Sequence, residues 1–241
     1  MKEKSPDYYK ELYNTAWDSA LKLSQEDYGD TLQSLEFLEK INLLHTDDKI
    51  LEIGCGIGKL CNSLHNKGFV NLIGTDISLN SINYGKTKYP QLELRVMNAD
   101  KLEFQDKSFD VCLSFDLIEH LPDITEHFNE VNRILKPNGY YLFQTPNIIF
   151  NSILETWKAR GFKWKAYHPS LQFPWTLRRA LKKSGFMKVK FIRIPPLSDY
   201  KLIQLPGFLR LVFKAIPWSS LPVSLQIGFW CIVTKENNNS I

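Results

Sequence analysis

Short apolar segments alternate with amphipathic segments through the middle of the chain. Apolar runs of five or six residues predict β-strands, and they lie at residues 49–53, 70–75, 92–96, 109–114 and 140–144. Between them, patterns typical of helices end at Asn66, cover residues 79–88, and run from Asp123 to Leu135. Lys136-Pro-Asn-Gly139 predicts a turn after the last of these helices. This alternation predicts an α/β fold, with a parallel sheet wound by right-handed crossovers.

The pattern is less regular after Pro146. A helix is predicted at residues 175–183, ended by Gly185, and strands are predicted at 186–194 and 227–234. A proline-rich insertion at 195–222 separates these two strands. Because no regular crossover helix joins them, we expect an antiparallel hairpin that closes the sheet.

Helical periodicity also marks residues 6–44, where apolar side chains recur at three- and four-residue steps. Tyr9, Tyr13 and Trp17 belong to this stripe, and they either pack into the core or cap a bound ligand as an N-terminal lid. We expect one domain over residues 1–241. It would comprise a helical cap at 1–47, a cofactor-binding core at 48–147 and a substrate-side segment at 148–241.

Charge is distributed unevenly along the 241 residues, whose formal net charge is +4. Residues 1–147 contain 15 Lys+Arg and 23 Asp+Glu, whereas residues 148–241 contain 15 Lys+Arg and only 3 Asp+Glu. The second segment also holds five of the six tryptophans. The overall hydrophobic fraction of 44% is ordinary for a globular protein and excludes a disordered chain. The basic, aromatic segment suggests an anionic or interfacial partner.

Several classes of site are not indicated. Cys55, Cys61, Cys112 and Cys231 form no C-x-x-C pair and have no histidine at zinc-ligand spacing, so we expect buried free thiols and no metal site. The charged N-terminus is unlike a signal peptide, and no uncharged apolar run reaches the ~18 residues of a membrane span. These features favour a cytoplasmic protein.

A glycine-rich motif follows the first predicted strand. Gly54, Gly56 and Gly58 are spaced G-x-G-x-G, with Glu52 two residues before the first glycine. Glycines at this place let the backbone turn tightly and approach a ligand closely. The dinucleotide fingerprint G-x-G-x-x-G would need a glycine where Lys59 stands, and no G-K-[ST] of a phosphate-binding P-loop follows.

Acidic residues follow the second and third predicted strands. Asp76 ends the second strand, where a carboxylate suits bidentate hydrogen bonding to ribose hydroxyls. Asn98-Ala99-Asp100 follows the third strand, where a carboxylate can accept from an adenine amino group. Ile77 and Leu102 are expected to sandwich the adenine ring.

These motifs occur together in an order that resembles the class I S-adenosylmethionine-dependent methyltransferases. The resemblance covers residues 48–147 and rests on Glu52-x-Gly54-x-Gly56-x-Gly58, Asp76, Asp100, Phe109-Asp110-Val111 and Leu135-Lys136-Pro137-x-Gly139. Ile118-Glu-His-Leu-Pro-Asp123 and Thr145-Pro-Asn147 are similar to the ubiquinone-biosynthesis O-methyltransferase group and its broad relatives.

The resemblance implies S-adenosylmethionine as the cofactor and a Rossmann-like, seven-stranded sheet whose last strand is antiparallel. It also implies cofactor-binding roles for residues of the core. Glu52, Gly54, Cys55, Gly56 and Gly58 would face the methionine moiety, and the backbone near Phe115 would meet its amino group. Asp76 would bind the ribose, and Ile77, Asn98, Ala99 and Asp100 would surround the adenine.

Two histidines are candidates for catalysis. His120 follows the fourth predicted strand at the mouth of this site, and His168 lies in the segment expected to cover it. Since imidazole titrates near neutral pH, either could act as the general base for an oxygen acceptor. The alternatives are a structural hydrogen bond for Glu119 and His120 and a plain surface turn for His168.

The insertion contains a short amphipathic pattern. Phe208, Leu211, Val212 and Ala215 fall on one helical face, and Arg210 and Lys214 on another. Such a helix can lie on an anionic membrane, close over a substrate pocket, or be an ordinary solvated helix. The scattered basic residues argue against a nucleic-acid partner, and nothing in the sequence indicates the oligomeric state.

The leading hypothesis is therefore a methyltransferase that acts on an oxygen of a small or lipid-linked acceptor, such as a quinone-type phenol, a sugar or a secondary metabolite. A nicotinamide-dependent oxidoreductase and a non-catalytic cofactor-binding module are the alternatives. The missing third glycine argues against the oxidoreductase, and the retained acidic residues argue against a non-catalytic module.

Overall fold

The structure is a computed structural model, and it describes residues 8, 11, 14, 15, 31–149, 152, 168–195, 203 and 207–235. Tyr9, Tyr13 and Trp17, the residues considered for a lid, lie outside the described residues. Within the described residues no helix is both long and apolar enough to cross a membrane.

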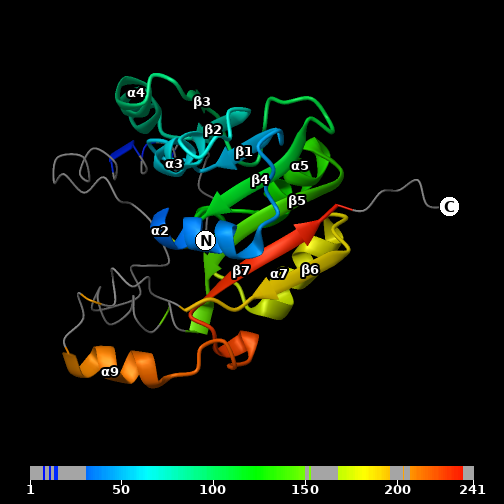
Figure 1. The fold of residues 1–241 in the computed structure, drawn as a ribbon. Coiled ribbons are helices and arrows are strands. Elements are labelled where there is room, and N and C mark those ends of the chain that lie inside the picture. Colours follow the sequence, from blue (N-terminus) through cyan, green and yellow to red (C-terminus); the bar gives the residue numbers. More distant parts are fainter. Residues whose placement is uncertain are drawn as a thin grey trace.

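One seven-stranded sheet forms the centre of the molecule (Figure 1). Its strands, in chain order, are β1 (Ile50–Ile53), β2 (Leu72–Asp76), β3 (Glu93–Val96), β4 (Phe109–Phe115), β5 (Leu135–Pro146), β6 (Lys188–Ile192) and β7 (Gly228–Thr234). Their order across the sheet is β3-β2-β1-β4-β5-β7-β6. The order reverses direction between β1 and β4, which is the place where ligands bind in doubly wound sheets.

The sheet is parallel from β3 to β5, and β7 is antiparallel to both of its neighbours, β5 and β6. Pro146 pairs with Gly228 and Tyr140 with Thr234, so β7 starts at the carboxyl end of β5 and pairs with residues 140–146 of that strand. The predictions of a mostly parallel seven-stranded sheet with an antiparallel last strand are confirmed.

Helices cover both faces of the sheet (Figure 1). They are α2 (Thr31–Ile41), α3 (Lys59–His65), α4 (Leu79–Lys88), α5 (Ile124–Ile134), α7 (Pro174–Lys183) and α9 (Gly207–Ala215), with short 3-10 helices η1 (Ile118–His120) and η3 (Val223–Leu225). The apolar sides of α5 and α7 share one buried cluster with the sheet, and those of α2, α3 and α4 share another. Each fully buried aliphatic or aromatic side chain in these clusters contributes roughly 1.5–3 kcal/mol to stability.

Helix α5 shows how the local sequence sets an element. The side chain of Asp123 accepts a hydrogen bond from the backbone N–H of Thr125 and so caps the helix. Phe128, Val131 and Ile134 then recur at three-residue steps and are completely buried. This geometry fixes the direction in which the chain leaves η1.

Strand β5 begins five residues earlier than expected. The Lys136-Pro-Asn-Gly139 segment, predicted as a turn, lies within β5. The backbone N–H of Asn138 donates to the carbonyl of Lys235, and the N–H of Lys235 donates to the carbonyl of Gly139. Asn138 has a φ of 65°, so the turn-like residue is accommodated inside a strand that the C-terminus pairs with.

Candidate functional site

The glycine motif forms a tight turn at the carboxyl end of β1. Gly54, Gly56 and Gly58 have φ values of 78°, 54° and 80°, which L side chains rarely adopt. A Cβ atom on Gly54 would lie 2.9 Å from a side-chain methyl of Leu117. The N–H groups of Gly54 and Cys55 donate to the carbonyl of Thr75, so the turn is tied to β2.

Asp76 lies at the carboxyl end of β2 and faces this turn. One of its carboxylate oxygens accepts from the N–H of Gly56 at 2.8 Å, and the other accepts from the N–H of Ser78 at 2.8 Å. Burial raises the pKa of Asp76, and these backbone hydrogen bonds oppose the rise. Asn14, one of the described N-terminal residues, accepts from the hydroxyl of Ser78 at 2.8 Å and so lies near the same edge.

Glu52 is buried in β1, beneath the glycine turn. Its carboxylate accepts from the thiol of Cys61, on α3, at 2.8 Å. Burial raises the pKa of Glu52 to about 7. The four cysteines are buried free thiols, as predicted.

A buried histidine, His127, supports the segment that follows β3. His127, on α5, bonds through Nδ1 to the carbonyl of Ala99 at 2.8 Å and through Nε2 to the hydroxyl of Tyr141 at 2.8 Å. Asp100 is half-buried, and desolvation raises the pKa of its carboxyl. Leu102, expected beside the adenine, packs in the core and donates its N–H to Glu130.

Phe115 ends β4 at the same edge and joins an aromatic cluster. Its ring centroid lies 6.1 Å from that of Phe37 on α2 and 5.7 Å from that of Trp230 on β7. The next residue, Asp116, has a φ of 49° and donates its N–H to the side-chain oxygen of Gln144. The backbone after β4 is therefore bent and fixed at the switch point.

The two candidate histidines lie side by side, although 48 positions separate them in the sequence. The ring centroids of His120 and His168 are 4.8 Å apart. The carboxylate of Glu119 is buried, accepts from the Thr145 hydroxyl at 2.9 Å, and lies 4.0 Å from Nε2 of His120. Burial raises the pKa of Glu119 to about 7. The N–H of Ser170 donates to the carbonyl of Glu119, which ties the two histidine segments together.

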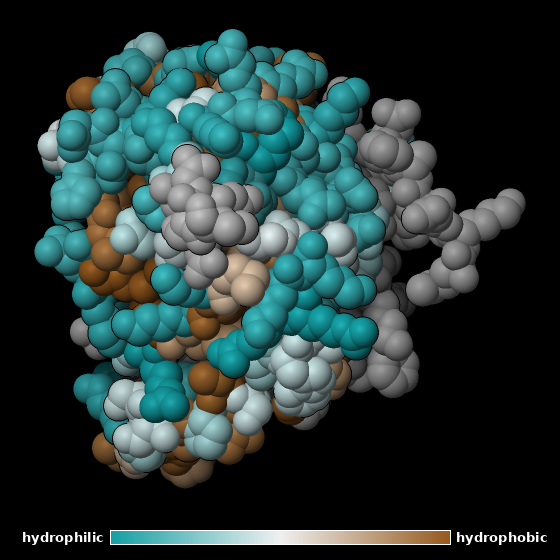
Figure 2. Space-filling view, turned by 90° about the vertical axis from the view of Figure 1, so that its right-hand side faces the viewer, coloured by the Kyte–Doolittle hydropathy of each residue, from teal (hydrophilic) through white to brown (hydrophobic). Residues whose placement is uncertain are grey.

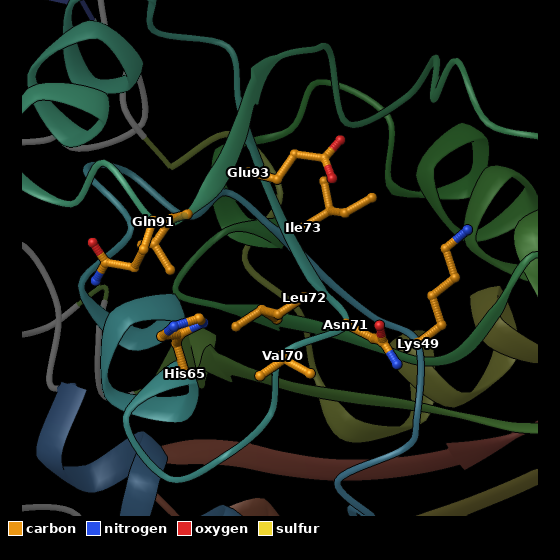
Figure 3. Close-up of a pocket in the computed structure, with 9 residues that line it drawn as sticks. Lys49, His65, Val70, Asn71, Leu72, Ile73, Gln91 and Glu93 are labelled. Carbon is orange, nitrogen blue, oxygen red and sulfur yellow. The ribbon is translucent and has the colours of Figure 1, made fainter.

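A cavity of about 290 Å³ lies at the opposite, amino end of the strands (Figure 3). Its lining comes from the starts of β1, β2 and β3 and the end of α3: Lys49, His65, Val70, Asn71, Leu72, Ile73, Gln91, Leu92 and Glu93. Strands β1 and β4 begin on the right-hand side of the molecule in Figure 1. Figure 2 shows this side, whose surface is mostly hydrophilic, with hydrophobic residues at its left and lower margins. None of the predicted site residues lines this cavity.

Comparisons with known proteins identify the family of the chain. A family model described as a methyltransferase domain matches residues 51–143. A ubiquinone biosynthesis O-methyltransferase of Bartonella tribocorum is 30% identical over 186 residues, covering 68% of this chain and 72% of its own. Phosphoethanolamine N-methyltransferase 1 of Arabidopsis thaliana is 30% identical over 194 residues, covering 68% of this chain and 39% of its own.

The fold is similar to that of solved methyltransferases. The comparison with the complex of the Haloferax volcanii Trm112 activator and a methyltransferase gives a TM-score of 0.69 at 16% identity, over 93% of this chain and 98% of that one. Phosphoethanolamine N-methyltransferase 2 of Haemonchus contortus gives a TM-score of 0.62 at 19% identity, over 85% of this chain and 53% of that one.

The chain belongs to the class I S-adenosylmethionine-dependent methyltransferases. It is an enzyme of this class, with S-adenosylmethionine as its cofactor, so the predictions of enzyme class and cofactor are confirmed. The nicotinamide-dependent alternative is left without support.

Two buried polar residues near the candidate site were not among the predicted site residues. The sequence left Glu119 open between a structural hydrogen bond and an active-site role, and it gave no indication of a role for His127. Both carry buried polar side chains whose partners, Thr145 and Tyr141, lie on β5. A polar residue on an otherwise apolar helix face was the available signal for His127.

Proposed function

We propose that this enzyme transfers a methyl group to an oxygen of a small or lipid-linked acceptor at the carboxyl edge of the sheet. The observation that carries the proposal is the pair formed by His120 and His168 beside the buried carboxylate of Glu119. A paired imidazole suits an acceptor that must lose a proton, such as a quinone-type phenol or a sugar hydroxyl. The similarity to ubiquinone biosynthesis O-methyltransferases supports this acceptor class.

The residues of the edge fit the cofactor. The turn at Gly54, Gly56 and Gly58 brings bare backbone to the edge, and the carboxylate of Asp76 is half-buried beside it. We assign the ribose hydroxyls to Asp76, because two further oxygen lone pairs can accept there. Asn98, Ala99, Asp100 and Ile77 would surround the adenine. The methionine moiety would lie near Glu52, Cys55 and the backbone of Phe115.

The cofactor, when bound, supplies a methyl group that its sulfonium makes electrophilic. The chain's own part is to align the acceptor, exclude water and remove a proton. His120 is the stronger candidate for the base, because the buried carboxylate of Glu119 lies 4.0 Å from its Nε2. His168 would orient the acceptor or share the proton.

A nitrogen acceptor is the second candidate. It is favoured by the 30% identity to a phosphoethanolamine N-methyltransferase and by the basic C-terminal segment, which suits an acceptor bearing a phosphate.

A transfer assay with labelled methyl donor would separate the two candidates. The enzyme would be offered three acceptors at equal concentration: a phenol with an apolar tail, a phenol without one, and a phosphorylated primary amine. We expect label in the phenol, with a rate that rises with pH as the base loses its proton. Label found only in the amine would replace the first proposal with the second.

A further inference from the structure

The connection between the last two strands lies at the same edge as the proposed site. Strands β5 and β6 are each antiparallel to β7, so β6 ends and β7 begins at the carboxyl edge. The segment that contains α9 joins these two ends. Figure 1 shows α9 at the lower end of the molecule, away from the helices that cover the sheet.

Helix α9 turns its apolar face outward. Phe208, Leu211, Val212 and Ala215 follow the i, i+3, i+4, i+7 spacing of one helical face. Phe208 is 74% exposed, Leu211 72% and Val212 44%. Ile203, which precedes the helix, is 66% exposed. In a soluble helix this face would pack inward, so its orientation requires a separate explanation.

The other side of α9 is fixed to the protein. The ring of Phe213 lies 5.0 Å from that of Trp218, whose indole N–H donates to the carbonyl of Phe213 at 2.9 Å. The side chain of Gln226 in turn donates to the carbonyl of Trp218 at 2.6 Å. The guanidinium of Arg210 is half-buried and donates to the carbonyl of Ile203. The exposed apolar face is therefore held in place by contacts on the opposite side.

Arg210 and Lys214 were expected together on one polar face. In the structure Lys214 is exposed, whereas Arg210 is directed into the contact with Ile203. Lys214 is thus the basic residue of the helix that is open to solvent. The described residues of the C-terminal segment at 168–195 and 207–235 include lysines and arginines but no aspartate or glutamate.

We infer that α9 docks on an anionic lipid surface, with Phe208, Leu211 and Val212 at the boundary between headgroups and acyl chains. An apolar face beside basic residues is the pattern of helices that lie in the membrane interface. The basic residues of the described C-terminal segment, among them the exposed Lys214, favour an anionic bilayer over a neutral one. This position would bring the carboxyl edge of the sheet toward the lipid, where an acceptor with an apolar tail resides. The inference does not depend on the acceptor's identity.

Flotation with vesicles of phosphatidylcholine, with and without phosphatidylglycerol, tests the inference on the full chain. We expect binding to the anionic vesicles that weakens about tenfold or more in Leu211→Glu, because this change places a charge in the interface. Lys214→Glu should weaken binding less and reduce its dependence on salt. Val70→Glu and Lys86→Glu are the matched controls and should bind as wild type. Val70 is an apolar residue at the amino edge that is 65% exposed.

Three results would overturn the inference. The first is wild-type binding that is no stronger to anionic than to neutral vesicles. The second is equal loss in Leu211→Glu and Val70→Glu. The third is an absence of vesicle binding together with an oligomer that Leu211→Glu dissociates, or with a raised KM for a water-soluble acceptor; these would make α9 an interface between copies or a lid. Circular dichroism of each variant shows that the fold is retained.

Discussion

The two edges of the same sheet differ: the amino edge has a cavity, and the carboxyl edge has a cluster of ionisable side chains. The amino edge holds a cavity of about 290 Å³, whose lining mixes apolar side chains with Lys49, Asn71 and Gln91. The carboxyl edge gathers a turn of positive-φ glycines, the carboxylate of Asp76 and a pair of histidine rings. Parallel strands explain the difference, because the loops that follow them meet at one edge and can combine residues distant in sequence.

The presence of a cavity does not by itself identify a functional site. The carboxyl edge carries carboxyl groups whose pKa burial has raised, whereas the cavity residue Lys49 directs its ammonium over the ring of Phe109. Neighbouring ionisable groups with shifted pKa values are typical of functional sites. Variants that are matched across the two edges can therefore test the comparison.

The largest effect is expected from the histidines. His120→Ala should lower kcat roughly 100-fold, the usual worth of a general base, while the Kd for S-adenosylhomocysteine stays near the wild-type value. His65→Ala, at the amino edge, is the control and should keep full turnover. Steady-state kinetics with calorimetric binding would measure both. Unchanged turnover in both His120→Ala and His168→Ala would reject a histidine base.

The next effect concerns cofactor binding. Asp76→Ala should raise the Kd for S-adenosylhomocysteine roughly 30- to 100-fold, because hydrogen bonds to a charged carboxylate are lost. Asp76→Asn can still accept from the N–H of Gly56, so it controls for a loss of the turn structure. It should weaken binding less than Asp76→Ala. Glu93→Ala at the amino edge is the matched control. Equal affinities for the Asp76 and Glu93 variants would refute the ribose assignment.

A smaller effect concerns pH and stability. The pKa of Glu52 rises from its ordinary value of 4.5 to about 7 on folding, so the folded protein holds a proton that the unfolded chain has lost in that window. Wild type should therefore lose stability relative to Glu52→Gln as pH rises from 5 to 8, by about 2 kcal/mol. Urea unfolding at several pH values measures the difference. A difference in stability that stays constant over this pH range would contradict the raised pKa of Glu52.

The smallest effect is expected from the support beneath the adenine segment. His127→Leu should cost roughly 1–3 kcal/mol of unfolding free energy, because the carbonyl of Ala99 loses its buried donor. It should weaken S-adenosylhomocysteine binding only a few-fold, since no direct contact is removed. His45→Leu, at an exposed position, is the control. A loss of binding as large as that in Asp76→Ala would make His127 part of the binding surface itself.

Local patterns predicted most of the fold. The Asp123 cap and the apolar stripe of α5 predicted that helix to within a residue at each end. The early start of β5 was missed, because the pairing of Asn138 with Lys235 joins segments almost a hundred residues apart. A turn signal such as Lys136-Pro-Asn-Gly139 is local and does not report that pairing.

The candidate site was predictable where it follows strand ends and less so where helices contribute. Gly54, Asp76 and Asp100 each follow a strand, and the topology alone brings them to one edge. The approach of His168 to His120 depends on how residues 168–172 cross the edge, and no period in the sequence encodes that. The outward direction of the apolar face of α9 was likewise not predictable, because helical periodicity gives the face but not the side toward which it points.

Hydrogen–deuterium exchange with and without S-adenosylhomocysteine tests most directly the claim that the carboxyl edge binds the cofactor. We expect protection at residues 54–58, 76–78 and 98–100, which come from three separate loops. Residues 70–73 and 91–93, at the amino-edge cavity, should exchange as in the free enzyme. Protection at the amino edge, or a melting temperature that rises without protection at the three loops, would contradict the account.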